Sequence, residues 1–154
     1  MSKKFIKQSI LAMGLFFVMS HMHAYAAKEK QLEKNYFQFV ISKYHTLRQG
    51  GQTVNIYVRY AYKQGLPTNE YCDYRKLRER VLKYMEPTDD FPTNVYWEIL
   101  ATEMGRELID DFPLDGVSVQ LEVLDNPSGE VFEPGDHGPI FTTGNIAPLS
   151  VFHN

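Results

Sequence analysis

Residues 52–62 restrict the fold more tightly than any other segment, because their side chains alternate strictly between two kinds. One set is Val54, Ile56, Val58, Tyr60 and Tyr62, and the other is Asn55, Tyr57, Arg59 and Ala61. A period of two residues predicts a β-strand with one face in the core. The other face is mixed in character, which suits packing against helices or lining a barrel.

Two amphipathic helices are predicted after this strand, because apolar residues recur at a spacing of three and four. The first covers residues 71–85, with an apolar stripe of Tyr74, Leu77, Val81, Tyr84 and Met85. The second lies within residues 91–113, with Thr93 as its N-cap and with Asp110, Asp111 and Pro113 at its end. Its stripe is Trp97, Leu100, Ala101, Met104 and Leu108.

Three further strands are predicted. Residues 36–44 are rich in aromatic and β-branched side chains, and residues 117–124 alternate again between apolar and polar. The last strand is either 130–133 or 139–143. We favour 139–143, because the sequence Pro-Gly-Asp-His-Gly at residues 134–138 is typical of a loop.

The resulting order is strand, strand, helix, helix, strand, strand. It predicts an α+β fold in which two antiparallel pairs form one four-stranded sheet with both helices on one face. An open sheet of this kind leaves exposed edges. We therefore expect a homo-oligomer in which edges of neighbouring copies pair to close a barrel.

The first 26 residues are typical of a secretory signal peptide. Lys3, Lys4 and Lys7 precede an apolar run, and Ala24-Tyr25-Ala26 provides a cleavage site. We expect export to the periplasm or the medium, with cleavage after Ala26 or Ala27; a retained N-terminal anchor is the alternative. Residues 27–154 then form a single domain with an irregular C-terminal tail.

Charge and reactive residues exclude several kinds of partner. Without the three signal lysines, 13 basic residues stand against 19 acidic ones, which does not favour nucleic acid or, after cleavage, a membrane as a partner.

Cys72 is the only cysteine, so it is expected to pack as a small apolar residue or to join two chains. The histidines outside the leader, His45, His137 and His153, lack the spacing of metal ligands. We predict no metal and no cofactor.

The order of elements and several short motifs resemble the tunnelling fold, and within it the dihydroneopterin aldolase family. The resemblance covers residues 36–143. Its motifs are Gly51-Gln52 before a strand, Cys72-Asp73-Tyr74 at the first helix, Glu98-Ile99-Leu100-Ala101 in the second, Phe112-Pro113 with Val117-x-Val119-x-Leu121, and Asp125-Asn126-Pro127. Pyruvoyl-tetrahydropterin synthases and GTP cyclohydrolases share this architecture and are a close second.

The resemblance implies a ligand site between subunits, in which Glu98 holds the guanidine-like edge of a pterin and Tyr74 lines the pocket. A carboxylate suits this task, because its two oxygens match two parallel N–H donors. Without the resemblance, Glu98 reads as a solvated residue near the positive end of a helix.

The family's acid–base residues are not matched. Its lysine after the third strand corresponds to Leu124, and its glutamate before Gly-Gln corresponds to Leu47. Neither leucine can transfer a proton. The zinc-binding histidines of the pyruvoyl-type relatives are not matched either.

Three functions follow from these observations. The first is an exported protein that binds a pterin-like or purine-like ligand without aldolase catalysis. The second is an active pterin or purine enzyme of aldolase or epimerase type with relocated acid–base residues, for which Tyr74, Glu98, Asp136 and His137 are the candidates. The third is an oligomeric scaffold or host-interaction protein that binds no small ligand.

Overall fold

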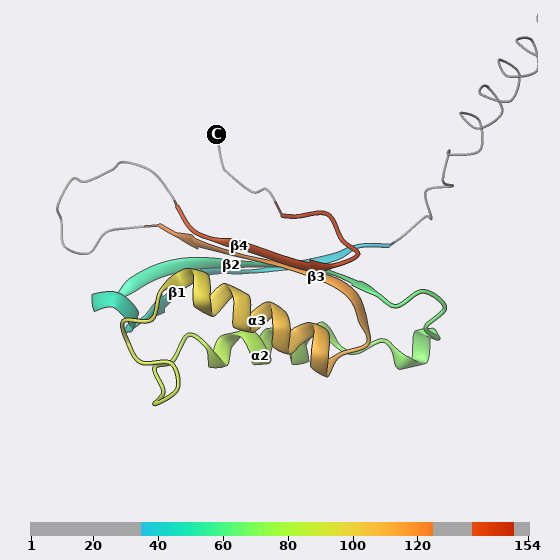
Figure 1. Cartoon of the computed structure of the whole chain (residues 1–154), viewed down its shortest axis with the longest axis horizontal. Coiled ribbons are helices and arrows are strands. Elements are labelled where there is room, and N and C mark those ends of the chain that lie inside the picture. The colour runs from blue at the N-terminus through green and yellow to red at the C-terminus, as the bar shows by residue number, and fades with distance from the viewer. Residues whose placement is uncertain (1–34, 125–136, 150–154) are drawn as a thin grey trace, which may run out of the picture. The chain divides into compact units, whose positions relative to one another are not determined.

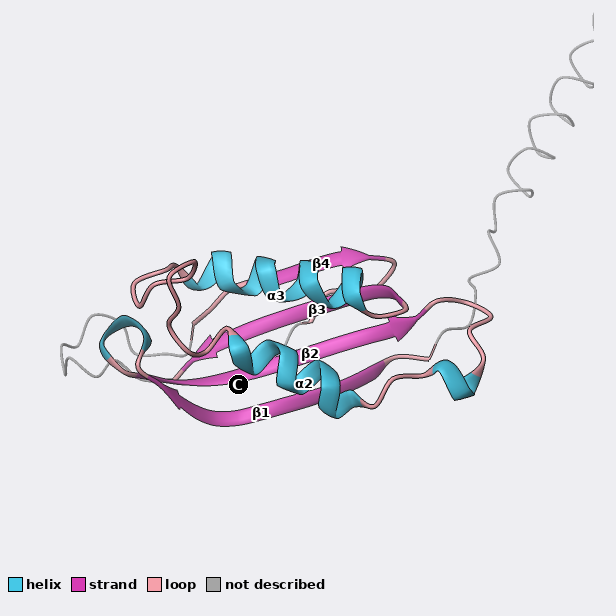
Figure 2. Cartoon of the chain, turned by 90° about the horizontal axis from the view of Figure 1, so that it is seen from below, coloured by secondary structure: helices cyan, strands magenta, loops and turns pink. Residues whose placement is uncertain are grey.

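A computed structural model describes residues 35–124 and 137–149. The elements, in order, are β1 (Phe37–Thr46), the 3₁₀ helix η1 (Arg48–Gly50), β2 (Gln52–Tyr62), the 3₁₀ helix η2 (Thr68–Glu70), α2 (Tyr74–Lys83), α3 (Trp97–Asp111), β3 (Leu114–Val123) and β4 (Ile140–Gly144). The strands form one antiparallel sheet in the order β1-β2-β3-β4. Both helices cover one face of it, which confirms the predicted α+β order (Figures 1 and 2).

The core lies between this sheet and the two helices. Val58 pairs with Val119 and Ile56 with Leu121, so the apolar residues of β2 and β3 share one face. All five residues of the stripe predicted for the second helix are buried against that face. The helices thus cover the apolar face of β2. The prediction that its mixed face packs against helices is therefore wrong.

Helix α3 begins three residues later than predicted, because the segment before it has other hydrogen-bond partners. The amide of Gln49 donates to the carbonyl oxygen of Thr93 at 3.0 Å, and the Gln49 side chain donates to Val95 O at 3.0 Å. The N-cap is Tyr96, which provides no side-chain hydrogen bond. Thr93 as N-cap is therefore wrong, because η1 holds this segment outside the helix.

Helix α2 is shorter than the predicted 71–85. Asp73 is its N-cap, accepting from the amide of Arg75 at 2.9 Å, and hydrogen bonds from Arg75 lower the pKa of Asp73 to about 2. The preceding residues serve a different purpose: Tyr71 stacks on Tyr62 with ring centroids 4.1 Å apart, and the Tyr62 hydroxyl donates to Cys72 O. These contacts keep residues 71 and 72 out of the helix. Cys72 is half-buried against the core, as its apolar reading requires.

Strand β4 pairs with β3 from Gln120↔Ile140 to Gly116↔Gly144, which confirms the strand predicted at 139–143. The alternative, residues 130–133, lies outside the described residues, as does the predicted signal peptide. Neither helix that the structure describes has the length and apolar character needed to cross a bilayer.

The face of the sheet opposite the helices carries buried polar side chains, among them Ser118, Gln120 and Glu122. Residues 145–149 return across this face (Figure 1), where the Leu149 amide donates to Ser118 Oγ at 2.9 Å. Glu122 Oε2 accepts hydrogen bonds from the Tyr57 hydroxyl at 2.7 Å and from Asn55 Nδ2 at 2.8 Å. These bonds reduce the desolvation penalty of the buried carboxylate, and they tie β2 to β3.

A buried arginine fixes the connection between the two helices. Arg48 has no exposed surface, and its guanidinium donates to four backbone carbonyl oxygens: Tyr84 at 2.7 Å, Glu86 at 2.8 Å, Phe91 at 3.1 Å and Pro92 at 2.8 Å. Only arginine presents a planar group with enough donors for this arrangement.

We expect Arg48→Ala to lower the free energy of unfolding by about 3 kcal/mol or more, because it leaves four backbone carbonyl groups without their donors and removes a fully buried side chain. Arg48→Lys should fall between the alanine variant and the wild type, since an ammonium has three donors in a different geometry. Urea unfolding followed by tryptophan fluorescence measures the change. Arg78→Ala is the control, because Arg78 is exposed and has no ion-pair partner among the described residues. Equal midpoints for Arg48→Ala and Arg78→Ala would show that the clamp contributes nothing.

Candidate functional site

Glu98 lies in the first turn of α3. Its side chain is exposed, and within the described part of the chain its carboxylate has no hydrogen-bond or ion-pair partner. Its backbone carbonyl oxygen accepts a hydrogen bond from the Thr102 hydroxyl at 2.7 Å. The helix dipole favours negative charge here. Two carboxylate oxygens therefore remain available to an external donor pair.

Tyr74, the second predicted ligand residue, lies at the other end of the helical layer. It opens α2 and is half exposed, with its ring centroid 6.0 Å from that of Phe39. The α2 start is tied to Tyr62, the last residue of β2, whereas the segment before α3 is tied to Gln49, just before β2 begins. The Tyr74 ring also lies over the edge strand β1 through its contact with Phe39, whereas α3 packs against β3 and β4. One protomer therefore does not bring Tyr74 and Glu98 together.

Gln52 is a third polar group at the Glu98 end, and sequence reasoning gave it no role. It is the first residue of β2, in phase with Val54 and Ile56, which places its side chain on the helix-covered face. Its Oε1 atom is buried and has no hydrogen-bond partner among the described residues. Gln52 continues the alternation of Val54 and Ile56 with a polar side chain, and this pattern in the sequence could have indicated a buried polar residue. The atom is free to accept from a bound N–H group or from water.

The two leucines in place of the family's acid–base pair also lie at this end. The Leu124 amide donates to Thr53 O at 3.0 Å, next to Gln52 along β2. Leu47 precedes η1 and is 69% exposed. Their correspondence to the family's lysine and glutamate rests on the motifs and stays a prediction.

His137 reaches the same end from β4. Its amide and carbonyl groups pair with those of Val123, at 3.4 Å and 2.7 Å, so the ladder between β3 and β4 extends to this residue. Asp136, the other candidate from this segment, and His153 lie outside the described residues. His45 is exposed on β1. Within residues 35–124 and 137–149, no three His, Cys, Asp or Glu side chains are grouped to hold a metal.

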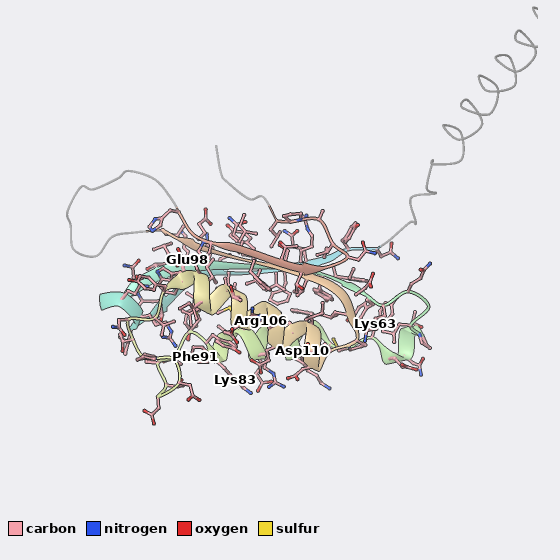
Figure 3. All side chains as sticks on the ribbon, in the orientation of Figure 1. Lys63, Lys83, Phe91, Glu98, Arg106 and Asp110 are labelled. Atoms are coloured by element: carbon pink, nitrogen blue, oxygen red, sulfur yellow. The ribbon has the colours of Figure 1, made fainter. Side chains whose placement is uncertain are left out.

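The two ends of the helical layer thus differ in chemistry. Figure 3 shows Glu98 at one end of α3, away from Asp110 and Lys63. The Glu98 end combines a free carboxylate, a buried amide oxygen and an imidazole. The Tyr74 end is aromatic, and it includes Phe37, Tyr62 and Tyr71 in mutual ring contact. Burial and the hydrogen bond to Cys72 raise the pKa of Tyr62, so this hydroxyl remains a donor at neutral pH.

Two crystal structures have the same fold. One is a dihydroneopterin aldolase from Burkholderia thailendensis bound to guanine, with 14% identity, a TM-score of 0.54, and coverage of 73% of this chain and 93% of that one. The other, from Vibrio cholerae, is assigned as a dihydroneopterin aldolase and has 15% identity, a TM-score of 0.53, and coverage of 74% and 100%. No family model and no curated protein matches the sequence. The chain therefore has the tunnelling fold, with dihydroneopterin aldolases among its structural neighbours.

Proposed function

We propose that this chain is an exported tunnelling-fold protein that binds a pterin-like or purine-like heterocycle and does not catalyse the aldolase reaction. The observation that supports the proposal is the unpaired Glu98 carboxylate in the first turn of α3. Pterins and guanine each present an amino group beside a ring N–H, and one carboxylate accepts from both. A structural neighbour was crystallised with guanine, which is consistent with this class of ligand.

The proposed site is shared between two copies of the chain. Glu98 and Tyr74 lie at opposite ends of one protomer, so a neighbouring copy has to supply Tyr74 to the Glu98 end. An aromatic ring there would stack on the flat face of the heterocycle while Glu98 holds its edge. Such an arrangement requires a homo-oligomer, and the open edges at β1 and β4 are available to form it.

Among the described residues, the two positions that the resemblance assigns to the aldolase acid–base pair carry leucines. Cleavage of a carbon–carbon bond by this route needs a positioned acid and base. Leu124 and Leu47 occupy the positions that correspond to the family's lysine and glutamate, and their side chains do not titrate. We therefore propose binding without turnover.

We expect the wild-type protein to bind neopterin, biopterin or guanine, and Glu98→Gln to weaken that binding by about 100-fold or more. The amide replaces one acceptor by a donor, so one hydrogen bond is lost and two N–H groups oppose each other. Isothermal titration calorimetry measures the dissociation constants. Asp110→Asn is the matched control, since it removes an exposed carboxylate from the other end of the same helix.

Three results would contradict the proposal. The first is that the wild type binds none of these ligands at millimolar concentration or, for guanine, at its solubility limit. The second is that Glu98→Gln and Asp110→Asn bind them equally well. Release of glycolaldehyde from dihydroneopterin, abolished by Glu98→Ala, would establish the enzyme alternative.

Sharing of the site predicts complementation between two defective variants. Tyr74→Ala and Glu98→Gln should each lose binding, but an oligomer refolded from an equal mixture should recover about a quarter of the sites, because some interfaces combine both intact residues. Sedimentation with labelled ligand counts the sites, and the mass of the complex gives the number of subunits. A monomer with full affinity, or a mixture without recovered sites, would rule out a shared site.

Export predicts a defined N-terminus. The full chain expressed in a bacterial host should yield a periplasmic or secreted product that begins at Ala27 or Lys28, because the leader is cleaved after a small residue. Intact mass and N-terminal sequencing identify the product. An uncleaved chain found in the membrane fraction would support the anchor alternative.

A further inference from the structure

One side of α3 points toward the edge strand β4. Glu98, Gly105 and Ile109 are separated by seven and eleven residues, so they lie on the same side of the helix. A Cβ atom added to Gly105 would overlap the ring of Phe141, and one added to Gly144 would lie 2.9 Å from Ile109 Cδ1. The helix and the strand therefore run in the same direction, with Gly105 beside Phe141 and Ile109 beside Gly144.

His137 lies on the helix-covered face of the same edge. Phe141 is opposite Val119, the Leu121 amide donates to Pro139 O at 3.0 Å, and His137 is opposite Val123. The register is thus unbroken from Phe141 back to His137. Because residues two apart in a strand share a face, His137 is on the side of Phe141, which faces α3.

Glu98 and His137 also lie at the same level along this edge. Seven residues of helix from Gly105 back to Glu98 rise by about 10 Å, and four residues of strand from Phe141 back to His137 extend over about 13 Å. Both side chains are exposed. A carboxylate and an imidazole are therefore both exposed at the edge between the start of α3 and β4.

We propose that His137 is a specificity-determining residue of the Glu98 site and donates a hydrogen bond to the ligand's ring carbonyl oxygen. This inference rests on the proposed function. In guanine and in oxidised pterins, the amino group, the ring N–H and the carbonyl oxygen form a row of donor, donor and acceptor. Glu98 accepts from the first two, and the His137 imidazole donates one N–H to the third. The preferred ligand class is thus a fused heterocycle with a lactam beside an amino-substituted carbon.

Guanine and 6-thioguanine form the test pair, because sulfur in place of the carbonyl oxygen keeps both N–H donors and is only a weak acceptor. Displacement of fluorescent neopterin gives the affinity of each base for the wild type, His137→Ala and His137→Gln. We expect His137→Ala to weaken guanine binding by about 10-fold and 6-thioguanine binding by much less. His137→Gln should restore most of the guanine affinity, because its amide N–H can replace the imidazole N–H.

The control is His45→Ala, which removes an exposed histidine from β1 and should bind both bases as the wild type does. Equal losses of guanine and 6-thioguanine in His137→Ala, or no loss of either, would overturn the role of His137 while Glu98-dependent binding remained. If the wild type bound neither base, the proposed function itself would fail, and the inference with it. Retained binding in Glu98→Gln would have the same consequence. The two failures are therefore distinguishable.

Discussion

The buried Arg48 guanidinium is the interaction on which the arrangement of the Glu98 end depends. It lies in η1, one residue after β1, and it donates to carbonyl groups on both sides of the α2–α3 connection. Gln49 adds two bonds to the segment before α3. The β1–β2 hairpin therefore determines where α3 begins, and with it the position of Glu98 relative to the sheet.

This constraint separates the domain into two chemically different ends. One end carries Glu98, Gln52 and His137, and the other carries the aromatic residues around Tyr74. The two groups are apart because the start of α2 is tied to the end of β2 and lies by β1, whereas the segment before α3 is tied to the residues before β2 and α3 packs against β3 and β4. Within the described residues of one protomer, Glu98 and Tyr74 do not meet, which is the physical reason for proposing a site between copies.

The opposite face of the sheet shows how a buried charged residue is accommodated on β3. Glu122 is almost fully buried, and its two hydrogen bonds come from residues of the adjacent strand, Asn55 and Tyr57. Each of these bonds compensates for part of the hydration that the carboxylate loses on burial, so breaking one would destabilise the fold. The mixed character of β2, visible in the sequence, therefore matches a polar layer in which Glu122 Oε2 is paired, whereas Glu122 Oε1 has no partner among the described residues. That the mixed face of β2 lines a barrel in an oligomer stays a prediction.

The sequence by itself determined the order of the elements, the strand pairs and the apolar stripe of α3, because side-chain periodicity is a local property that burial then exploits. It also singled out Glu98 and Tyr74 as ligand residues through the resemblance. It misplaced the start of α3, because Thr93 is a good N-cap by type but its carbonyl group bonds to Gln49, a partner 44 positions away. Only the tertiary structure decided that Gln52 and His137 share the Glu98 end and that Tyr74 does not, since pairing register and helix direction set which distant residues become neighbours.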